Sequence, residues 1–114
     1  MVRTKNELKK ILDRFIVETQ KKIPVQKIIL FGSYAKGNPK KWSDIDIAVI
    51  SPHFAGMNGF QRTKFLLDCV HQIKLDLPVD IETFGYTPIE YEHASHFDFL
   101  GVIMESGKVI YPSK

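Results

Sequence analysis

The sequence of 114 residues has little cysteine and no long apolar run. Its single cysteine, Cys69, has no partner for an internal disulfide and suits a reducing compartment. No apolar stretch approaches the roughly 20 residues that a membrane-spanning helix needs, and the N-terminal MVRTKNELKK lacks the apolar centre of a signal peptide. We therefore expect a cytoplasmic protein without a membrane segment, in which Cys69 belongs to the core.

Neither sign of charge dominates the sequence. Sixteen Lys and Arg residues oppose thirteen Asp and Glu residues, and the net charge of +3 is by itself too small to indicate nucleic-acid binding. Glycine and proline are also few, at seven and six residues, and 44% of the residues are hydrophobic, which excludes a disordered or fibrous protein. We expect one domain, residues 1–114.

Hydrophobic periodicity predicts a mixture of helices and strands, and hence the α+β class. Apolar residues at helical spacing, with Thr4 and Glu7 as a capping box, predict a helix over residues 4–22 that Pro24 ends. The other predicted elements are a strand over 25–31, a loop over 33–43 with room for one helical turn at 33–36, a strand over 44–50, a helix over 60–75, a strand over 78–84, helical segments at 89–92 and 97–105, and a strand over 108–111.

Two aspartates, Asp44 and Asp46, alternate with apolar residues in the second predicted strand. Residues two apart on a strand point to the same face, about 6.5–7 Å apart at the backbone, so these side chains can converge on one point. At ~4 Å and an effective dielectric of about 20, two such charges repel by about 4 kcal/mol, which favours a bound cation or a proton. Oxygen ligands without histidine or thiolate indicate Mg²⁺ or Mn²⁺.

Gly32 and Ser33 follow the first predicted strand and open the loop that leads to the aspartates. Small residues at the end of a strand leave backbone N–H groups open to a phosphate, in particular where a helical turn begins. Lys36 adds positive charge in the same loop, as do Lys40 and Lys41, which are more typical of solvated loop charges. Together with the aspartate pair, the loop predicts a site for a metal-bound polyphosphate.

The order of the elements also predicts a sheet in which these groups meet. Gly32 ends the first strand and Asp44 starts the second, so antiparallel pairing of these two strands brings the residues together. A right-handed helical crossover then makes the third strand parallel to the second, and its acidic residues reach the same rim. Asp80 and Glu82 face the same way, and we favour Asp80 as the third carboxylate because it lies nearer the rim.

The motifs G-S-Y-A-K-G, S-D-I-D-I-A-V-I and V-D-I-E together resemble the nucleotidyltransferase superfamily of the DNA polymerase β type. In size the chain is most similar to the minimal nucleotidyltransferases of that superfamily. The resemblance spans residues 25–84, and the closing G-K-V-I-Y is also typical. It implies an α+β fold of the polymerase β palm type, with a mixed β-sheet flanked by helices.

The resemblance also implies a reaction and the residues that perform it. AMP would pass from ATP to an acceptor hydroxyl, pyrophosphate would leave, and two Mg²⁺ ions, with Mn²⁺ as a substitute, would be held by the carboxylates. The implied residues are Asp44, Asp46 and Asp80 for catalysis and metal binding, with Asp80 helping to take the hydroxyl proton, and Gly32, Ser33 and Lys36 for the phosphates. Arginine is commoner in the family at the position of Lys36, and Tyr34 stands where a basic residue is frequent, which weakens the case for bidentate phosphate contact.

The acceptor and the partner follow from the resemblance alone. Minimal nucleotidyltransferases typically pair with a small helical HEPN-domain protein, as antitoxins that AMPylate a tyrosine of the toxin, so we expect a homo- or hetero-oligomer. Two alternatives stay open: a non-catalytic module that neutralises a partner by contact, and a nucleotidyltransferase that acts on small molecules. No residue identifies the nucleobase; Tyr34 and Trp42 could stack on it or pack on the surface, and His93 and His96 are expected at the surface.

Overall fold

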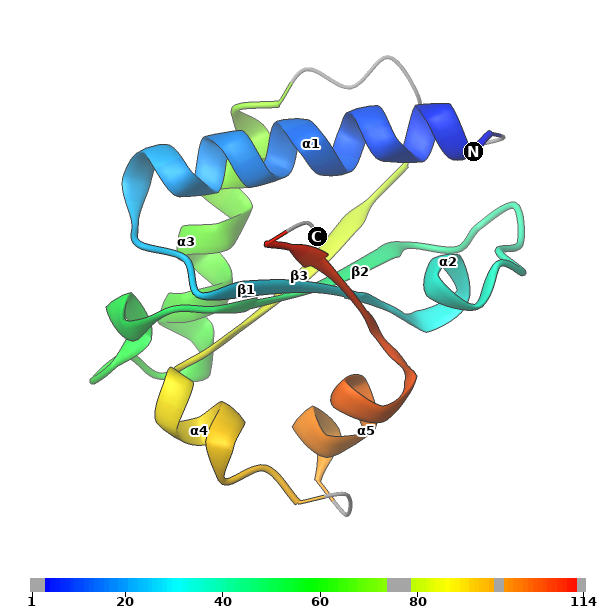
Figure 1. The fold of residues 1–114 in the computed structure, drawn as a ribbon. Coiled ribbons are helices and arrows are strands. Elements are labelled where there is room, and N and C mark those ends of the chain that lie inside the picture. Colours follow the sequence, from blue (N-terminus) through cyan, green and yellow to red (C-terminus); the bar gives the residue numbers. More distant parts are fainter. Residues whose placement is uncertain (1–3, 74–78, 96–97, 113–114) are drawn as a thin grey trace.

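The computed structural model describes residues 4–73, 79–95 and 98–112, and in them helices surround a β-sheet (Figure 1). The helices are α1 (Lys5–Lys22), α2 (Gly32–Lys36), the 3₁₀ turn η1 (Pro52–Phe54), α3 (Gly59–His71), α4 (Pro88–Glu92) and α5 (Phe99–Ser106). The strands are β1 (Lys27–Phe31), β2 (Ile45–Ile50), β3 (Ile81–Tyr86) and β4 (Lys108–Tyr111). The predicted α+β class is confirmed.

The four strands form a mixed sheet in the order β3-β2-β1-β4. β1 and β2 are antiparallel, and β2 and β3 are parallel with α3 between them in the chain, as the sequence predicted. β4 pairs antiparallel with the other side of β1. This arrangement brings the end of β1 and the beginnings of β2 and β3 to one rim of the sheet.

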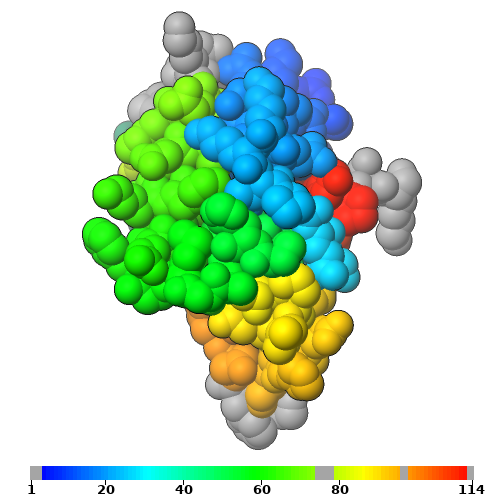
Figure 2. All heavy atoms as spheres, turned by 90° about the vertical axis from the view of Figure 1, so that its left-hand side faces the viewer, coloured from blue at the N-terminus to red at the C-terminus, as the bar shows by residue number. Residues whose placement is uncertain are grey.

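The two faces of the sheet pack against different helices. Figure 1 shows α1 above the sheet and α4 and α5 below it, and Figure 2 shows α1 and α3 side by side. Ile47 and Val49 of β2 point into the core formed with α1 and α3, whereas Ala48 and Ile50 point into a second core that includes α5. Because side chains alternate along a strand, Asp46 lies on the same face as Ala48, toward α4 and α5.

Helix α1 forms as its sequence predicts. Thr4 and Glu7 make the reciprocal hydrogen bonds of a capping box, and Phe15 lies fully buried on the apolar face of the helix. The helix ends at Lys22, two residues before Pro24. Although α1 has 18 residues, no helix in the part of the chain that the structure describes is both long and apolar enough to cross a bilayer.

Several predicted boundaries differ from the structure: β1, β2 and β3 begin at Lys27, Ile45 and Ile81 instead of at residues 25, 44 and 78, so Asp44 and Asp80 lie just before their strands. α3 ends at His71 instead of residue 75, and positions 74, 75, 78 and 97 of the predicted elements lie outside the described residues. β3 continues to Tyr86 instead of ending at residue 84, because Gly85 and Tyr86 still pair with the end of β2. Gly85 suits this position since a Cβ there would lie 3.0 Å from the ring of Phe54.

Candidate functional site

Gly32 begins α2 immediately after β1 and brings the backbone against Asp46. Its φ of +74° lies in the left-handed region, which glycine adopts without steric cost. A Cβ at this position would overlap with Asp46 Oδ2. Two independent constraints therefore require glycine here, one from the conformation of the turn and one from the approach of the aspartate.

Helix α2 is a single turn whose first N–H groups have no carbonyl partner within the helix. These groups include the N–H of Ser33, and they begin where the backbone touches Asp46. Lys36 is exposed and lies one helical turn after Gly32, on the same side of the helix. The turn that holds the predicted phosphate-binding residues therefore begins against Asp46, at Gly32, as the antiparallel topology required.

Asp46 lies in the middle of the rim, between the glycine turn and β3. It pairs with Phe31 of β1 and with Glu82 of β3, so these three side chains lie on one face of the sheet. Partial burial, the charges of Glu82 and Asp44, and a hydrogen bond with Glu82 raise the pKa of Asp46 to about 6. Near neutral pH this carboxylate cluster therefore favours binding of either a proton or a cation.

Asp80 lies just before β3, one ladder step closer to the rim than Ile81. Its backbone carbonyl accepts a hydrogen bond from the Ile45 N–H at 2.9 Å, which fixes Asp80 beside the start of β2. The structure thus brings Asp44, Asp46 and Glu82 together, with Glu82 as the hydrogen-bonding partner of Asp46, and leaves Asp80 exposed at the rim. The sequence placed Asp80 and Glu82 on one face but did not reveal which of them lies opposite Asp46.

The other candidates for base or metal contact lie elsewhere. Tyr34 is buried in the core with α1 and α3, on the opposite face of the sheet from Asp46, so it cannot stack on a base at this site. Trp42 is 78% exposed in the loop that precedes Asp44. His93 is exposed at the end of α4, as predicted, and His96 lies outside the described residues.

Comparison with known proteins identifies the family. The family model described as the nucleotidyltransferase domain matches residues 8–108. The chain belongs to this family. It is therefore a nucleotidyltransferase, and the resemblance carried by its glycine loop and aspartate motifs is confirmed.

Individual relatives agree with this identification. A proposed protein adenylyltransferase of Methanocaldococcus jannaschii is 36% identical over 76 residues, which are 67% of this chain and 88% of that protein. The crystal structure of a proposed nucleotidyltransferase from Sulfolobus solfataricus has a TM-score of 0.64 at 17% identity, over 97% of this chain and 91% of the other. A toxin–antitoxin structure with AMP-PNP has a TM-score of 0.55 at 23% identity, over 90% of this chain and 73% of the other. The two structures support the nucleotidyltransferase fold.

The donor set at the rim fits a hard divalent cation of the kind this nucleotidyltransferase family implies. Asp44, Asp46 and Glu82 offer only oxygens, and a cation would relieve the charge repulsion that, together with partial burial, raises the pKa of Asp46. Within residues 4–73, 79–95 and 98–112, no three His, Cys, Asp or Glu side chains already have the geometry of a metal site. Mg²⁺ usually keeps several waters and shares substrate phosphates, so a complete protein cage is not required for it.

Proposed function

We propose that this nucleotidyltransferase transfers AMP from ATP to a hydroxyl group of a partner protein. The observation that carries the proposal is the contact between the start of α2 and Asp46, which joins an anion-binding turn to a carboxylate cluster. A triphosphate and a divalent cation need these two features side by side. The name of the Methanocaldococcus jannaschii relative, a proposed protein adenylyltransferase, supports a protein as the acceptor.

Each residue of the site has a role in this proposal. The N–H groups of Gly32 and Ser33 bind the terminal phosphates, and the Lys36 ammonium neutralises part of their charge. Asp44 and Asp46 would hold two Mg²⁺ ions, with Asp80 as the third carboxylate, and Mg²⁺ would there lower the pKa of the acceptor hydroxyl and neutralise charge on the phosphates. One of these three carboxylates also accepts the proton of the acceptor hydroxyl, and we assign this role to Asp80.

The reaction forms one bond and breaks one. The acceptor oxygen forms a bond to the α-phosphorus of ATP, the bond between the α-phosphorus and the bridging oxygen to the β-phosphate breaks, and pyrophosphate leaves. The proton of the acceptor hydroxyl passes to the carboxylate of Asp80. Positioning of the two reactants at one rim accounts for much of the rate expected of such an enzyme.

We propose as acceptor a tyrosine hydroxyl of a small helical HEPN-domain toxin, for which this chain is the antitoxin. The similarity to a toxin–antitoxin structure containing AMP-PNP supports both a protein partner and a nucleoside triphosphate. Among the described residues, the short helices α4 and α5 pack below the sheet face that carries Asp46, and Asp80 is exposed at the rim, where a partner could reach it. The functional assembly would then be a hetero-oligomer.

The test is transfer of radioactive label from ATP to the partner encoded next to this gene, in the presence of Mg²⁺. We expect label from the α-phosphate, but not from the γ-phosphate, to appear on a partner tyrosine that tandem mass spectrometry then locates. The variant with both Asp44→Asn and Asp46→Asn should bind the partner without labelling it. Neutralisation of the partner by this variant as effectively as by the parent chain would instead establish inhibition by contact.

A further inference from the structure

Three phenylalanine rings from separate elements meet on the carboxylate face of the sheet. The ring centroids of Phe31 and Phe84 are 5.7 Å apart, those of Phe31 and Phe99 are 5.8 Å apart, and those of Phe84 and Phe99 are 5.2 Å apart. Phe31 ends β1, Phe84 lies in β3 and Phe99 begins α5. We refer to these three residues as the phenylalanine cluster.

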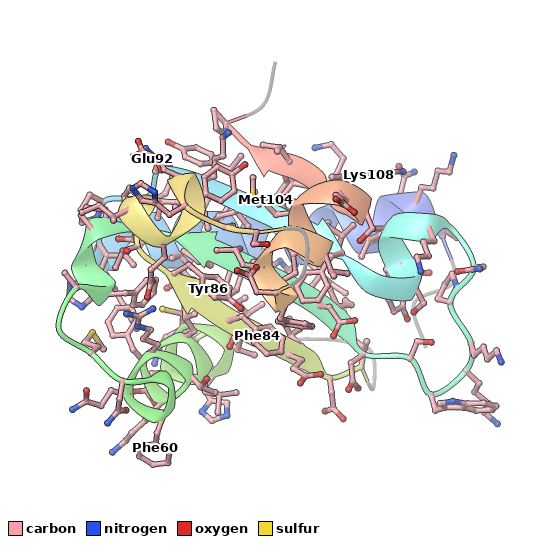
Figure 3. The ribbon with its side chains drawn as sticks, turned by 90° about the horizontal axis from the view of Figure 1, so that it is seen from below. Phe60, Phe84, Tyr86, Glu92, Met104 and Lys108 are labelled. Atoms are coloured by element: carbon pink, nitrogen blue, oxygen red, sulfur yellow. The ribbon has the colours of Figure 1, made fainter. Side chains whose placement is uncertain are left out.

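The phenylalanine cluster borders the carboxylates directly. Phe31 precedes Gly32 in the chain and pairs with Asp46 across the sheet. Phe84 follows Glu82 by two residues on the same face, so their Cα atoms are about 7 Å apart. Figure 3 shows Phe84 and Tyr86 side by side on this face of the sheet, beside α5. A molecule held by its phosphates at Gly32 therefore has the rings within reach of its nucleoside part.

Phe99 is largely exposed, although other residues of α5 already anchor the helix on the sheet. The helix is anchored by the buried residues Leu100, Gly101 and Ile103, whereas Phe99 remains 51% exposed. Phe31 is buried and Phe84 is partly buried, so Phe99 contributes most of the exposed apolar surface of the cluster. Exposed aromatic surface beside a binding site is typical of a ligand contact.

We propose that the phenylalanine cluster is the surface on which the nucleobase of the bound triphosphate stacks. The inference rests on the proposed function, because it takes the phosphates to lie at Gly32 and the α-phosphate to lie at Asp46. Phenyl rings offer π-faces and no hydrogen-bonding groups, so the cluster recognises the flat shape of a base and not its edge. The enzyme then prefers purines over pyrimidines through stacking area and discriminates ATP from GTP only weakly.

Calorimetric titration in the presence of Mg²⁺ separates the contribution of the base to binding from that of the phosphates. The probes are ATP and inorganic tripolyphosphate, and the protein carries Phe99→Ala, Phe99→Leu or Phe99→Trp. Phe99→Ala and Phe99→Leu should weaken ATP binding by about tenfold, since stacking of one base contributes roughly that factor or more, and Phe99→Trp should retain it. Tripolyphosphate should bind all variants equally. Phe99→Leu keeps an apolar side chain that packs on Phe31 and Phe84 of the sheet, so its effect reports on stacking and not on folding.

Val102→Ala is the matched control, because Val102 lies one turn along α5 and is 50% exposed. It should leave ATP binding unchanged. Equal ATP affinity of the parent and the Phe99 variants would overturn the inference. So would Phe99 variants that lose transfer to the acceptor but still bind ATP normally. Trp42→Ala is measured in parallel, and a loss of ATP affinity in this variant alone would place the base at Trp42 instead. A parent protein that binds ATP no better than tripolyphosphate would overturn the inference alone, whereas one that binds neither would overturn the proposed function with it.

Discussion

At the scale of single residues, the site depends on the contact between Gly32 and Asp46. Any side chain at position 32 would displace the Asp46 carboxylate, and partial burial together with the neighbouring carboxylate of Glu82 raises the pKa of Asp46. Both effects follow from atoms that meet only in the folded sheet. The residue types were predictable from the motifs, but their mutual contact was not.

Gly32→Ala should strongly lower the rate of transfer, while Gly56→Ala should not. Both glycines have a φ near +80°, at +74° and +80°, so either substitution should cost about 1–2 kcal/mol of stability through backbone strain. Only position 32 adds an overlap with Asp46, and a displaced carboxylate should lower the rate by about 100-fold. Steady-state transfer rates and urea unfolding of both variants test this. Equal losses of activity in the two variants would mean that strain alone explains the effect.

Asp46→Asn should stabilise the metal-free protein at pH 7.5. The pKa of Asp46 is raised from 3.8 to about 6 in the folded protein, so the fold binds this proton more tightly than the unfolded chain does. The contribution of Asp46 to the free energy of unfolding therefore falls as the pH rises between about 4 and 6, and Asn removes this loss. We expect Asp46→Asn to raise the free energy of unfolding by roughly 1 kcal/mol at pH 7.5 and not at all near pH 4. The gain is modest because solvent screens the charge of a half-exposed group. Urea unfolding in EDTA should show it; an Asp46→Asn protein less stable than the parent at pH 7.5 would contradict the electrostatic assignment.

Asp80→Asn and Glu82→Gln should separate the roles of the two β3 carboxylates. If Asp80 accepts the hydroxyl proton, its amide variant should lower the transfer rate by about 10²–10⁴-fold. Glu82 is the hydrogen-bonding partner of Asp46, and Gln keeps a hydrogen-bonding group there, so we expect less than about a tenfold loss. Rates at saturating ATP, with thermal melting as the folding control, decide between them. The reverse order of effects would assign the third carboxylate to Glu82.

At the scale of elements, Arg62 ties α3, β3 and α4 together. Its Nε donates to the Met57 carbonyl at 2.9 Å, and its Nη1 donates to the Gly85 carbonyl at 3.1 Å and to Glu90 Oε1 at 2.6 Å. Partial burial opposes ionisation of Glu90, but the hydrogen bonds from Arg62 and from Thr87 lower the pKa of Glu90 nonetheless. These contacts tie the far end of β3, at Gly85, to α3 and α4.

Arg62→Ala should therefore destabilise the protein by roughly 2–3 kcal/mol, because it removes the Arg62 hydrogen bonds to the Gly85 and Met57 carbonyls and leaves the Glu90 carboxylate with the Thr87 N–H but without its cation. Lys64→Ala, an exposed position on the same helix, should change stability by less than about 0.5 kcal/mol. Since Glu90 titrates below its ordinary range, the difference between the parent and Arg62→Ala should shrink as the pH falls through that pKa. Chemical denaturation at several pH values measures it. A difference that does not depend on pH would mean that packing, and not the ion pair, dominates.

Element types and strand directions were largely predictable from the sequence, for physical reasons. The apolar stripe and capping box of α1 are local patterns, as is the alternation of Asp44 and Asp46 with apolar residues at the start of β2. The register of β3 against β2 is not determined by a local sequence pattern. It includes the pairing of Gly85 and Tyr86 with β2, beyond the predicted end of the strand at residue 84. This register places Glu82 opposite Asp46, while the assignment of Asp80 as the third carboxylate stays a prediction.

At the scale of the whole molecule, one mixed sheet gathers groups that are far apart in the chain. Gly32, Asp46 and Glu82 come from three different elements, and the central strands β1 and β2 hold them at one rim. The phenylalanine cluster extends this rim toward α5. The burial of Tyr34 on the opposite face and the exposure of Phe99 could not be read from the sequence, because both depend on which helices cover which face.

The most direct test of the account is a crystal structure with Mn²⁺ and a non-hydrolysable ATP analogue, recorded at a wavelength where manganese scatters anomalously. The account predicts anomalous density within about 2.2 Å of carboxylate oxygens of Asp44 and Asp46. It also predicts that the terminal phosphates lie against the N–H groups of Gly32 and Ser33. An analogue bound in the crystal with its phosphates elsewhere, and no manganese between the two aspartates, would contradict it.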